Sequence, residues 1–408
     1  MTKQSDPIPA VIFSGGAEIV SLALAHSLLS REIPLVVFSL GKPSLLKSLP
    51  GVIHHEQMDW PPRDPAATVG SIRNLLQSLS VGRPTFPWPA FATEDGGLRL
   101  LIENRSELSS YLQIGGSPQL KFGGLDKAEL FRFLSNAGLD HLLAETQVLD
   151  NPDQLPSMFQ RFSDTGLVVK PALKPLSMDL STLGAKAIAV RSSRELEHQA
   201  RRLQTAWPIS NRWVAQPLLT APPQGEAVWY GMRTSSGAMI GLTAYERWKY
   251  PPMGGSASWV ETREVPGLQA MATEILNSLG FTGVAELAFL QDQNGNWRLI
   301  ELNPRPWLQS ALPETAGLPL LYLAYLDLAG LPCSLPDISP QYGIHWINME
   351  RLVLAAMTGA YGNPLKALWQ AQQIIRLSHH IAVWSTPLPL VRRRWILRLL
   401  SQLSSRSG

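Results

Sequence analysis

The chain of 408 residues has little cysteine and no apolar run of the roughly 18 residues that a transmembrane helix needs. Its single cysteine, Cys333, excludes an internal disulfide framework and any zinc site built on several cysteines. The most hydrophobic region, residues 311–330, is interrupted by two prolines and two acidic residues. Residues 1–10 lack the apolar run of a signal peptide, so we expect a cytoplasmic protein.

A strong excess of either charge sign is also missing. Lysine and arginine number 35 against 32 acidic residues, and the net charge of +3 does not predict a nucleic-acid partner. The exception is the basic, leucine-containing segment 392–403, which could contact an anionic membrane surface peripherally. Such a helix more often packs on its own domain. Hydrophobic residues make up 45% of the chain, which is typical of a globular protein.

The predicted strands and helices divide the chain into four parts. The first opens with a strand, a helix and a second strand over residues 11–38, a pattern typical of a parallel βαβ unit. A small α/β unit, an antiparallel sheet and a mostly helical extension follow, so the fold class combines α/β and α+β architecture. The boundaries of these parts are 1–120, 121–210, 211–330 and 331–408.

Two apolar strands around the turn signal at 292–295 predict a β-hairpin that carries polar side chains. A four-residue loop would pair Glu286 with Glu301, and a two-residue loop would pair Glu286 with Asn303. Both registers place these three side chains on one face. Two carboxylates and an amide favour a hard cation such as Mg²⁺, and Arg305 could add a bidentate phosphate contact. The alternative is a solvated face whose glutamates pair with lysine or arginine.

With this hairpin the sequence resembles the ATP-grasp superfamily, and most closely its carboxylate–amine ligase branch, which includes D-aspartate ligase-like proteins. That superfamily carries an acidic residue on one strand of its last hairpin and Glu-x-Asn-x-Arg on the next. Here these are Glu286 and the segment Glu301–Arg305. The resemblance spans about residues 8–330. It implies a Rossmann-like N-terminal domain, a small α/β lid and a C-terminal antiparallel-sheet ATP domain.

Two lysines extend the resemblance. Lys127, in an Asp-Lys pair at a predicted helix start, resembles the family lysine that reaches the nucleotide phosphates. Lys170, before Pro171, resembles the lysine of a V-x-K-P strand that contacts the α- and β-phosphates. Either lysine alone would be typical of a protein surface, but their order ahead of the hairpin favours the phosphate role.

The strand that ends at Gln216 resembles the hinge that binds adenine through backbone groups, so Gln216 and Leu218 are expected at the nucleotide base. Pro217 stands where the family usually has glutamate, and proline has no N–H to donate. Glu226 falls where relatives place an acid near the ribose. Residues 172–183 contain no glycine, whereas many relatives have a glycine-rich loop there that folds over the triphosphate.

Residues 245–256 resemble the K/R-x-Y-P-P-x-x-G segment of the D-aspartate ligase-like branch. Arg247 and Lys249 alternate along a predicted strand, so we expect both on one face, where they could meet a carboxylate or an acyl phosphate. The alternative is a solvated strand edge before a Pro-Pro turn. Arg247, Lys249 and Arg305 are therefore the expected catalytic residues.

The resemblance implies an ATP-dependent ligase that forms an amide bond through an acyl phosphate and releases ADP and phosphate. ATP and Mg²⁺ or Mn²⁺ are the expected cofactors, with the metal on Glu286, Glu301 and Asn303. The expected partners are a small-molecule carboxylate and amine, with amino acids as candidates, and a second copy of the chain in a homodimer. Two alternatives remain: other ATP-grasp chemistry, such as carboxylation or attack by a non-amine nucleophile, and a nucleotide-binding regulatory protein without turnover.

Overall fold

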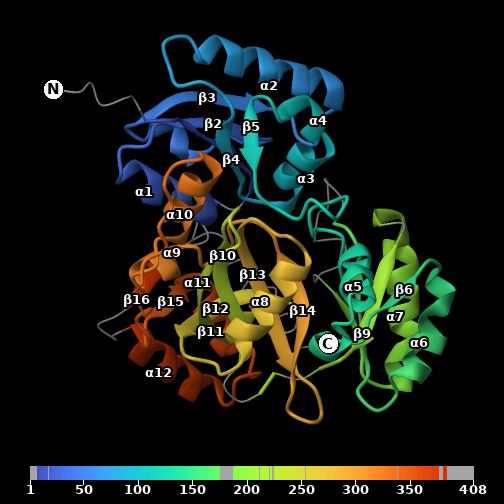
Figure 1. Ribbon diagram of the computed structural model, residues 1–408. Coiled ribbons are helices and arrows are strands. Elements are labelled where there is room, and N and C mark those ends of the chain that lie inside the picture. The colour runs from blue at the N-terminus through green and yellow to red at the C-terminus, as the bar shows by residue number, and fades with distance from the viewer. Residues whose placement is uncertain are drawn as a thin grey trace.

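The computed structural model describes residues 7–16, 18–174, 187–210, 212–219, 221–222, 225–252, 254–337, 339–375 and 380–383. Its strands form three sheets: a leading sheet at the top of Figure 1, a large core sheet below it, and a small lid sheet beside the core. The basic segment 392–403 and most of the glycine-free loop 172–183, for which the sequence suggested a membrane contact and a cover over the triphosphate, lie outside the described residues.

The leading sheet is parallel, as the βαβ pattern predicts, with the order β3-β2-β1-β4-β5. Its strands are β1 (Ala10–Ser14), β2 (Leu35–Leu40), β3 (Val52–Met58), β4 (Trp88–Ala92) and β5 (Leu112–Ile114). The helices of this part are α1 (Glu18–Leu29), α2 (Pro65–Leu79), α3 (Asp95–Glu103) and α4 (Arg105–Leu108). Strands β1, β2 and β4 are buried along their whole length, as expected when helices cover both faces of a parallel sheet. The strand order reverses between β1 and β4, where such sheets bind ligands at their carboxyl ends.

The lid sheet has the order β6-β9-β7-β8 and packs one face on helices. Its elements are α5 (Lys127–Asn136), β6 (Gln147–Leu149), α6 (Leu155–Arg161), β7 (Leu167–Pro171), β8 (Ile188–Val190), α7 (Ser193–Ala206) and β9 (Trp213–Pro217). Leu167 and Val169 of β7 lie in the apolar core of the lid. Because side chains alternate along a strand, Val168 and Lys170 point to the opposite face. Strand β9 belongs to this sheet, although the sequence pattern groups it with the strands that follow.

The core sheet has the order β14-β13-β10-β11-β12-β15-β16. Its strands are β10 (Glu226–Arg233), β11 (Met239–Tyr250), β12 (Ser256–Thr262), β13 (Gly283–Gln291), β14 (Trp297–Asn303), β15 (His345–Asn348) and β16 (His380–Val383). Helix α8 (Leu268–Ser278) packs on one face through Ala272 and Ile275, close to Trp229 of β10. The extension expected to be mostly helical contributes α11 (Met349–Met357) and α12 (Pro364–Ile375), but its strands β15 and β16 also complete the sheet.

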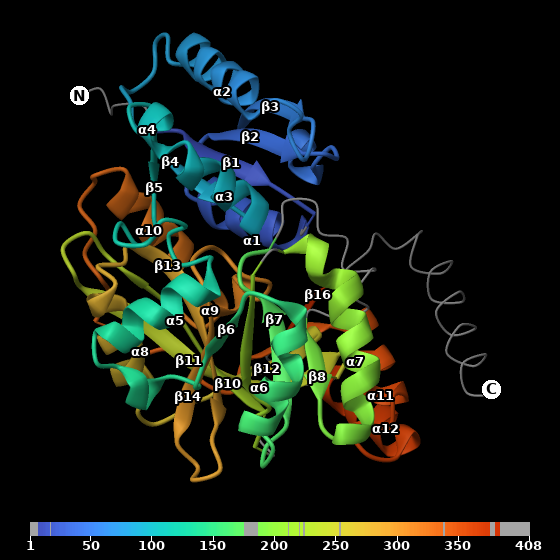
Figure 2. The same cartoon turned by 90° about the vertical axis from the view of Figure 1, so that its right-hand side faces the viewer.

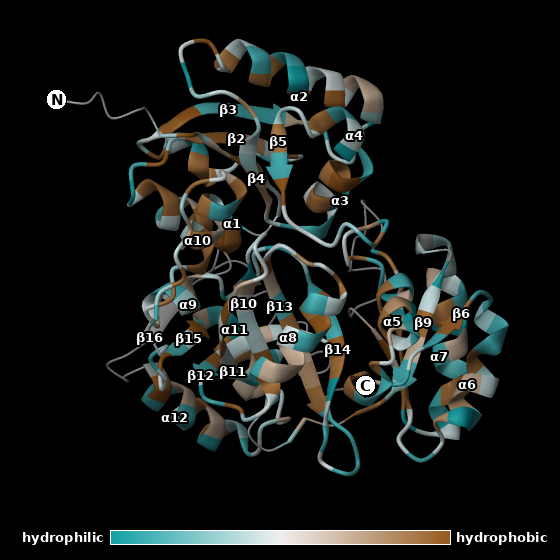
Figure 3. Ribbon diagram, in the orientation of Figure 1, coloured by the Kyte–Doolittle hydropathy of each residue, from teal (hydrophilic) through white to brown (hydrophobic). Residues whose placement is uncertain are grey.

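The other face of the core sheet packs on α9 (Ala311–Thr315) and α10 (Leu320–Leu328) and, through them, on the leading domain. Figure 3 shows α10 as one of the most hydrophobic segments on this side. Among the described residues, no helix has both the length and the apolar character needed to cross a bilayer.

A short backbone bridge joins the leading domain to the core. The N–H of Gly116 donates to the carbonyl of Thr282 at 2.8 Å, and the N–H of Thr282 donates back at 3.2 Å. A Cβ atom on Gly115 would lie 2.7 Å from the Thr282 carbonyl oxygen, so a larger residue would force the two backbones apart. The bridge places the carboxyl ends of the leading strands over the core sheet, as Figure 2 shows from the side.

Candidate functional site

The hairpin of β13 and β14 brings the expected metal ligands together on one face. Glu286 lies opposite Asn303, and Glu301 lies opposite Ala288, which shares the face of Glu286. The loop at 292–296 is longer than either predicted length, but a bulge after Ala288 restores the pairing of Glu286 with Asn303. The Asn303 Nδ2 donates to Glu286 Oε2 at 3.1 Å.

Carboxylates on and around this hairpin repel one another. Burial raises the pKa of Glu286 to about 8, and the nearby carboxylates of Glu246 and Glu301 add to the shift. Such a donor set fits a hard divalent cation, which would relieve the repulsion. The described residues contain no group of three or more His, Cys, Asp and Glu side chains that could hold a metal ion. A cation bound by two carboxylates and Asn303 would therefore take further oxygen ligands from water or phosphate.

Two lysines from the lid face this hairpin. Asp126 accepts a hydrogen bond from the Glu129 N–H and so caps α5, which fixes Lys127 at the start of the helix. The Lys127 Nζ lies 3.2 Å from Glu301 Oε1. Burial lowers the pKa of Lys170, and no described side chain forms an ion pair or a hydrogen bond with its amine. The site thus holds a half-buried cation that an anionic ligand could neutralise.

A second charged cluster lies on the same face of the core sheet. The Lys249 Nζ is 2.7 Å from Glu226 Oε2 and 3.0 Å from Glu246 Oε2. Glu226 and Glu246 are direct neighbours across β10 and β11. Burial alone would lower the pKa of Lys249, but the two carboxylates raise it far above its ordinary value, so the lysine stays charged. Sequence reasoning missed Glu246, although its position in the segment 245–256 was an available signal.

The expectation that Arg247 and Lys249 share a face is wrong. Register shifts on both sides of Trp248 interrupt the alternation along β11 and turn Lys249 toward the carboxylates of the site. Arg247 instead pairs with Glu261 at 2.9 Å, and its guanidinium lies 5.5 Å from the ring centre of Trp259. The structure therefore separates Arg247 from the face that carries the hairpin carboxylates.

Asp95 is the most important residue that sequence reasoning missed. It begins α3, and its carboxylate lies 2.5 Å from Arg305 Nε and 2.6 Å from Lys174 Nζ. Burial by itself would raise the pKa of Asp95, but Arg305 and Lys174 hold it well below its ordinary value. The available signal was its position just after a strand of a parallel sheet, next to the reversal of strand order.

The hinge strand β9 presents side chains on the face of the lid sheet that also carries Lys170, because Val168 and Lys170 pair with Gln216 and Val214. The Gln216 amide nitrogen donates to Thr146 Oγ1 at 2.9 Å, while its buried amide oxygen has no partner among the described residues. The N–H of Leu218 donates to the carbonyl of Gly166 at 2.9 Å. The Leu218 N–H is thus already used within the lid, whereas the Gln216 amide oxygen is an unused acceptor among the described residues.

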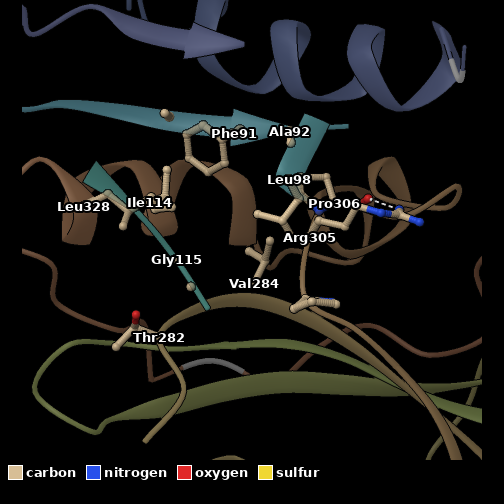
Figure 4. Close-up of a pocket in the computed structure, with 13 residues that line it drawn as sticks. Phe91, Ala92, Leu98, Ile114, Gly115, Thr282, Val284, Arg305, Pro306 and Leu328 are labelled. Carbon is tan, nitrogen blue, oxygen red and sulfur yellow. Dashed lines mark hydrogen bonds between the residues drawn. The ribbon is translucent and has the colours of Figure 1, made fainter. Parts of the chain in front are cut away.

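Arg305 also borders a small, mostly apolar pocket between the leading domain and the core (Figure 4). Phe91 and Ala92 line it from β4, and Val284 lines it from β13. The Arg305 Nη1 donates to the Pro306 carbonyl at 2.9 Å, the contact drawn in Figure 4. The phosphate-binding candidate thus lies beside a surface that the two domains build together.

Comparisons with known proteins establish the fold. No protein-family model and no curated protein sequence matches the chain. An N5-carboxyaminoimidazole ribonucleotide synthetase solved with ADP superposes with a TM-score of 0.63 at 15% identity, covering 92% of this chain and 98% of its own. Biotin carboxylase from Campylobacter jejuni gives 0.61 at 13% identity, with 83% and 74% covered. L-amino acid ligase from Bacillus licheniformis gives 0.57 at 15% identity, with 80% and 75% covered.

These structures share one architecture with the parallel leading sheet, the lid sheet and the antiparallel core described above. The chain has the ATP-grasp fold. At identities this low the likeness concerns the fold, and the activity has to be argued from the residues of the site.

Proposed function

We propose that this chain is an ATP-dependent ligase that activates a small carboxylate as an acyl phosphate and transfers the acyl group to an amine. The proposal rests on one observation: the same site contains neighbouring carboxylates that favour a cation and a lysine that favours an anion. Glu286 and Glu301 bring two carboxylates together, which raises the pKa of Glu286 and which a cation would relieve, and Lys170 is a half-buried ammonium group with no ion pair to a described residue. A metal–nucleotide complex supplies both the cation and the anion.

Different residues would bind the metal ion and the phosphates. Glu286, Glu301 and Asn303 would hold Mg²⁺, which supplies neutralisation of phosphate charge when bound. Lys127 and Lys170 would bind the phosphates from the lid side, and Arg305 would hold the transferred phosphoryl group. These assignments use the ATP-grasp fold together with the contacts described above.

The reaction then follows in two balanced steps. A carboxylate oxygen attacks the γ-phosphorus of ATP, the bond from that phosphorus to the bridging oxygen breaks, and ADP leaves. The neutral amine attacks the acyl carbon, phosphate leaves with the bonding electrons, and the amine nitrogen loses one proton. Lysine and arginine side chains stabilise the charge that develops on the transferred phosphoryl oxygens.

At the other end of the site, the Glu226–Lys249–Glu246 cluster would border the ribose and the substrate. Lys249 is already neutralised by two carboxylates, so we assign it the role of holding Glu226 and Glu246 in place rather than of binding a free carboxylate. Glu226 keeps its proposed position near the ribose hydroxyls, from which its second carboxylate oxygen could accept a hydrogen bond.

A second candidate function differs only in the carboxylate. The neighbour that covers the largest share of both chains among the three is a synthetase whose name describes a carboxyamino product. Bicarbonate activated as carboxyphosphate would be the corresponding substrate. Bicarbonate therefore belongs in the same screen as the amino acids and small carboxylic acids.

The decisive experiment measures ADP release from ATP and Mg²⁺ with each carboxylate, with and without amines. Hydroxylamine should trap the activated intermediate of an organic carboxylate as a hydroxamate. Glu301→Gln should reduce Mg²⁺-dependent ADP release at least about 100-fold in a protein that stays folded, because it removes one charged metal ligand. The surface variant Glu264→Gln is the matched control and should behave as the wild type. If the wild type binds no nucleotide, or Glu301→Gln keeps full activity, the proposed function is wrong.

A further inference from the structure

The Asp95 carboxylate connects the leading domain to side chains of the lid and the core. Asp95 begins α3 in the leading domain, Lys174 follows β7 in the lid, and Arg305 follows β14 in the core. The carboxylate lies 2.5 Å from Arg305 Nε through one oxygen and 2.6 Å from Lys174 Nζ through the other. The side chains of Asp95 and Arg305 are only 19% and 15% exposed, so solvent screens their contact weakly.

Two nitrogens of the Arg305 guanidinium donate hydrogen bonds to described residues, and the third remains available. Asp95 accepts from Nε, and the Pro306 carbonyl accepts from Nη1. Within the described part of the chain, Nη2 has no hydrogen-bond acceptor. Among those residues the Lys174 amine donates a hydrogen bond only to Asp95, which leaves ammonium hydrogens available. Both cations therefore keep donors that can reach a second anion.

Both cations lie near the phosphate end of the proposed site. The carboxylates of Glu286 and Glu301 act on Arg305, and Glu301 acts on Lys174, so both cations lie close to the hairpin. One carboxylate between two cations leaves a net positive charge, which attracts phosphate. Without the carboxylate, the two like charges would repel each other and lose their common anchor.

We propose that Asp95 is a positioning residue for phosphoryl transfer: it fixes Arg305 and Lys174 so that their free donors meet the transferred phosphoryl group. The leading domain thereby completes the reaction centre, although it supplies none of the expected nucleotide contacts. This inference rests on the proposed function, since it concerns the γ-phosphate of that reaction. It assigns Asp95 no direct contact with substrate.

The test uses a nucleotide complex that imitates transfer and needs no knowledge of the carboxylate. ADP with aluminium fluoride places a phosphoryl mimic where the γ-phosphate transfers, whereas ADP alone does not. Asp95→Asn keeps the size and an acceptor oxygen but removes the charge. We expect its affinity for Mg²⁺–ADP–aluminium fluoride to fall about 10–100-fold, the range for loss of well-oriented charged contacts. Its affinity for Mg²⁺–ADP should change less than about threefold, because Lys127 and Lys170 remain.

Three further proteins make the result specific. Asp95→Glu restores the charge and should recover part of the affinity. Glu103→Gln breaks the 2.7 Å ion pair with Arg99 on the same helix and should leave both affinities unchanged. In an Arg305→Lys background, Asp95→Asn should have a smaller effect, because one of the two contacts through which Asp95 acts, that to Arg305 Nε, is already lost.

The outcomes separate the inference from the proposed function. If the wild type binds neither complex, the proposed function fails and the inference fails with it. If the wild type binds both but Asp95→Asn weakens them equally, or weakens neither, Asp95 is only a link between domains and the inference is overturned. If Asp95→Asn unfolds, Asp95→Glu and the single variant Arg305→Lys decide: equal loss for both complexes contradicts positioning, and selective loss for the fluoride complex supports it.

Discussion

Single residues of the site carry charges that only a ligand would balance. Lys170 is the clearest case, because burial lowers its pKa although Glu301 and Glu226 act on it from a distance, and no described carboxylate forms an ion pair with its amine. A half-buried ammonium group in this state gains more from a phosphate than an exposed lysine would, since less water competes for its hydrogens.

Replacing Lys170 by methionine should weaken Mg²⁺–ADP binding by about 1.5–3 kcal/mol, or roughly 10–150-fold, the value of a hydrogen bond to a charged group. Titration calorimetry measures this directly. Lys366→Met, which removes an exposed lysine on α12, is the control and should bind as the wild type. Equal affinity of the two variants would contradict the assignment of Lys170 to the phosphates.

The pH dependence of stability provides a test of Asp95 at the same scale. Its folded-state pKa is held well below the ordinary value of 3.8, so its ion pairs stabilise the native state above that pH. That contribution should be lost as the pH falls below about 4 toward the folded-state pKa. The gap in unfolding free energy between wild type and Asp95→Asn should therefore be constant from about pH 5 to 7 and shrink in more acidic urea titrations. A gap that widens in acid would contradict the ion pairing.

At the scale of elements, the irregularity in β11 decides which charges belong to the site. A regular strand would put Arg247 and Lys249 on one face, but the register shifts around Trp248 send them to opposite faces. Lys249 then neutralises Glu226 and Glu246, whose side chains are 14% and 8% exposed.

Lys249→Met should therefore destabilise the fold by about 3 kcal/mol, because it leaves two buried carboxylates without their cation. It should also weaken nucleotide binding, since Glu226 loses its anchor. Arg247→Met acts on the other face of the sheet and should leave nucleotide affinity unchanged. Thermal unfolding and calorimetry of the two variants test this. A stronger loss of nucleotide affinity from Arg247→Met would contradict the separation of Arg247 from the site.

At the scale of the whole molecule, the site depends on how the leading domain sits on the core. The backbone bridge between Gly116 and Thr282 comes one residue before β13, and β13 carries Glu286. Asp95 adds a second connection from the same domain to Arg305. Displacement of the leading domain should therefore change the site as well as the stability.

Gly115→Ala tests this coupling, because the new Cβ would lie 2.7 Å from the Thr282 carbonyl oxygen. We expect a loss of about 1–3 kcal/mol of stability, as for other overpacking changes, together with weaker nucleotide binding. Gly70→Ala is the matched control: its Cβ has no neighbour within 4 Å in α2, and alanine favours a helix by roughly 0.5–1 kcal/mol. A Gly115→Ala protein as stable as the wild type would refute the tight approach.

The sequence by itself determined the hairpin and the order of the three sheets. Alternation along a strand is a local rule, so it placed Glu301 and Asn303 on one face. Glu286 joins them because the bulge after Ala288 offsets the longer loop, which the sequence did not reveal. Lys127 and Lys170 could be named as candidate phosphate ligands because each stands next to a local signal, a helix cap for Lys127 and a strand end for Lys170.

Only the tertiary structure decided what these residues meet. Asp95 and Arg305 are 210 positions apart, and no local pattern announces a contact that depends on the packing of one domain on another. The shared face of Glu246 and Lys249 could not be predicted from the sequence. A β-bulge adds a residue to a strand, and the pattern of alternating residues does not reliably reveal it. Secondary structure follows from short-range sterics and periodicity, whereas the charge balance of a buried site follows from groups that only the folded chain brings within a few ångströms.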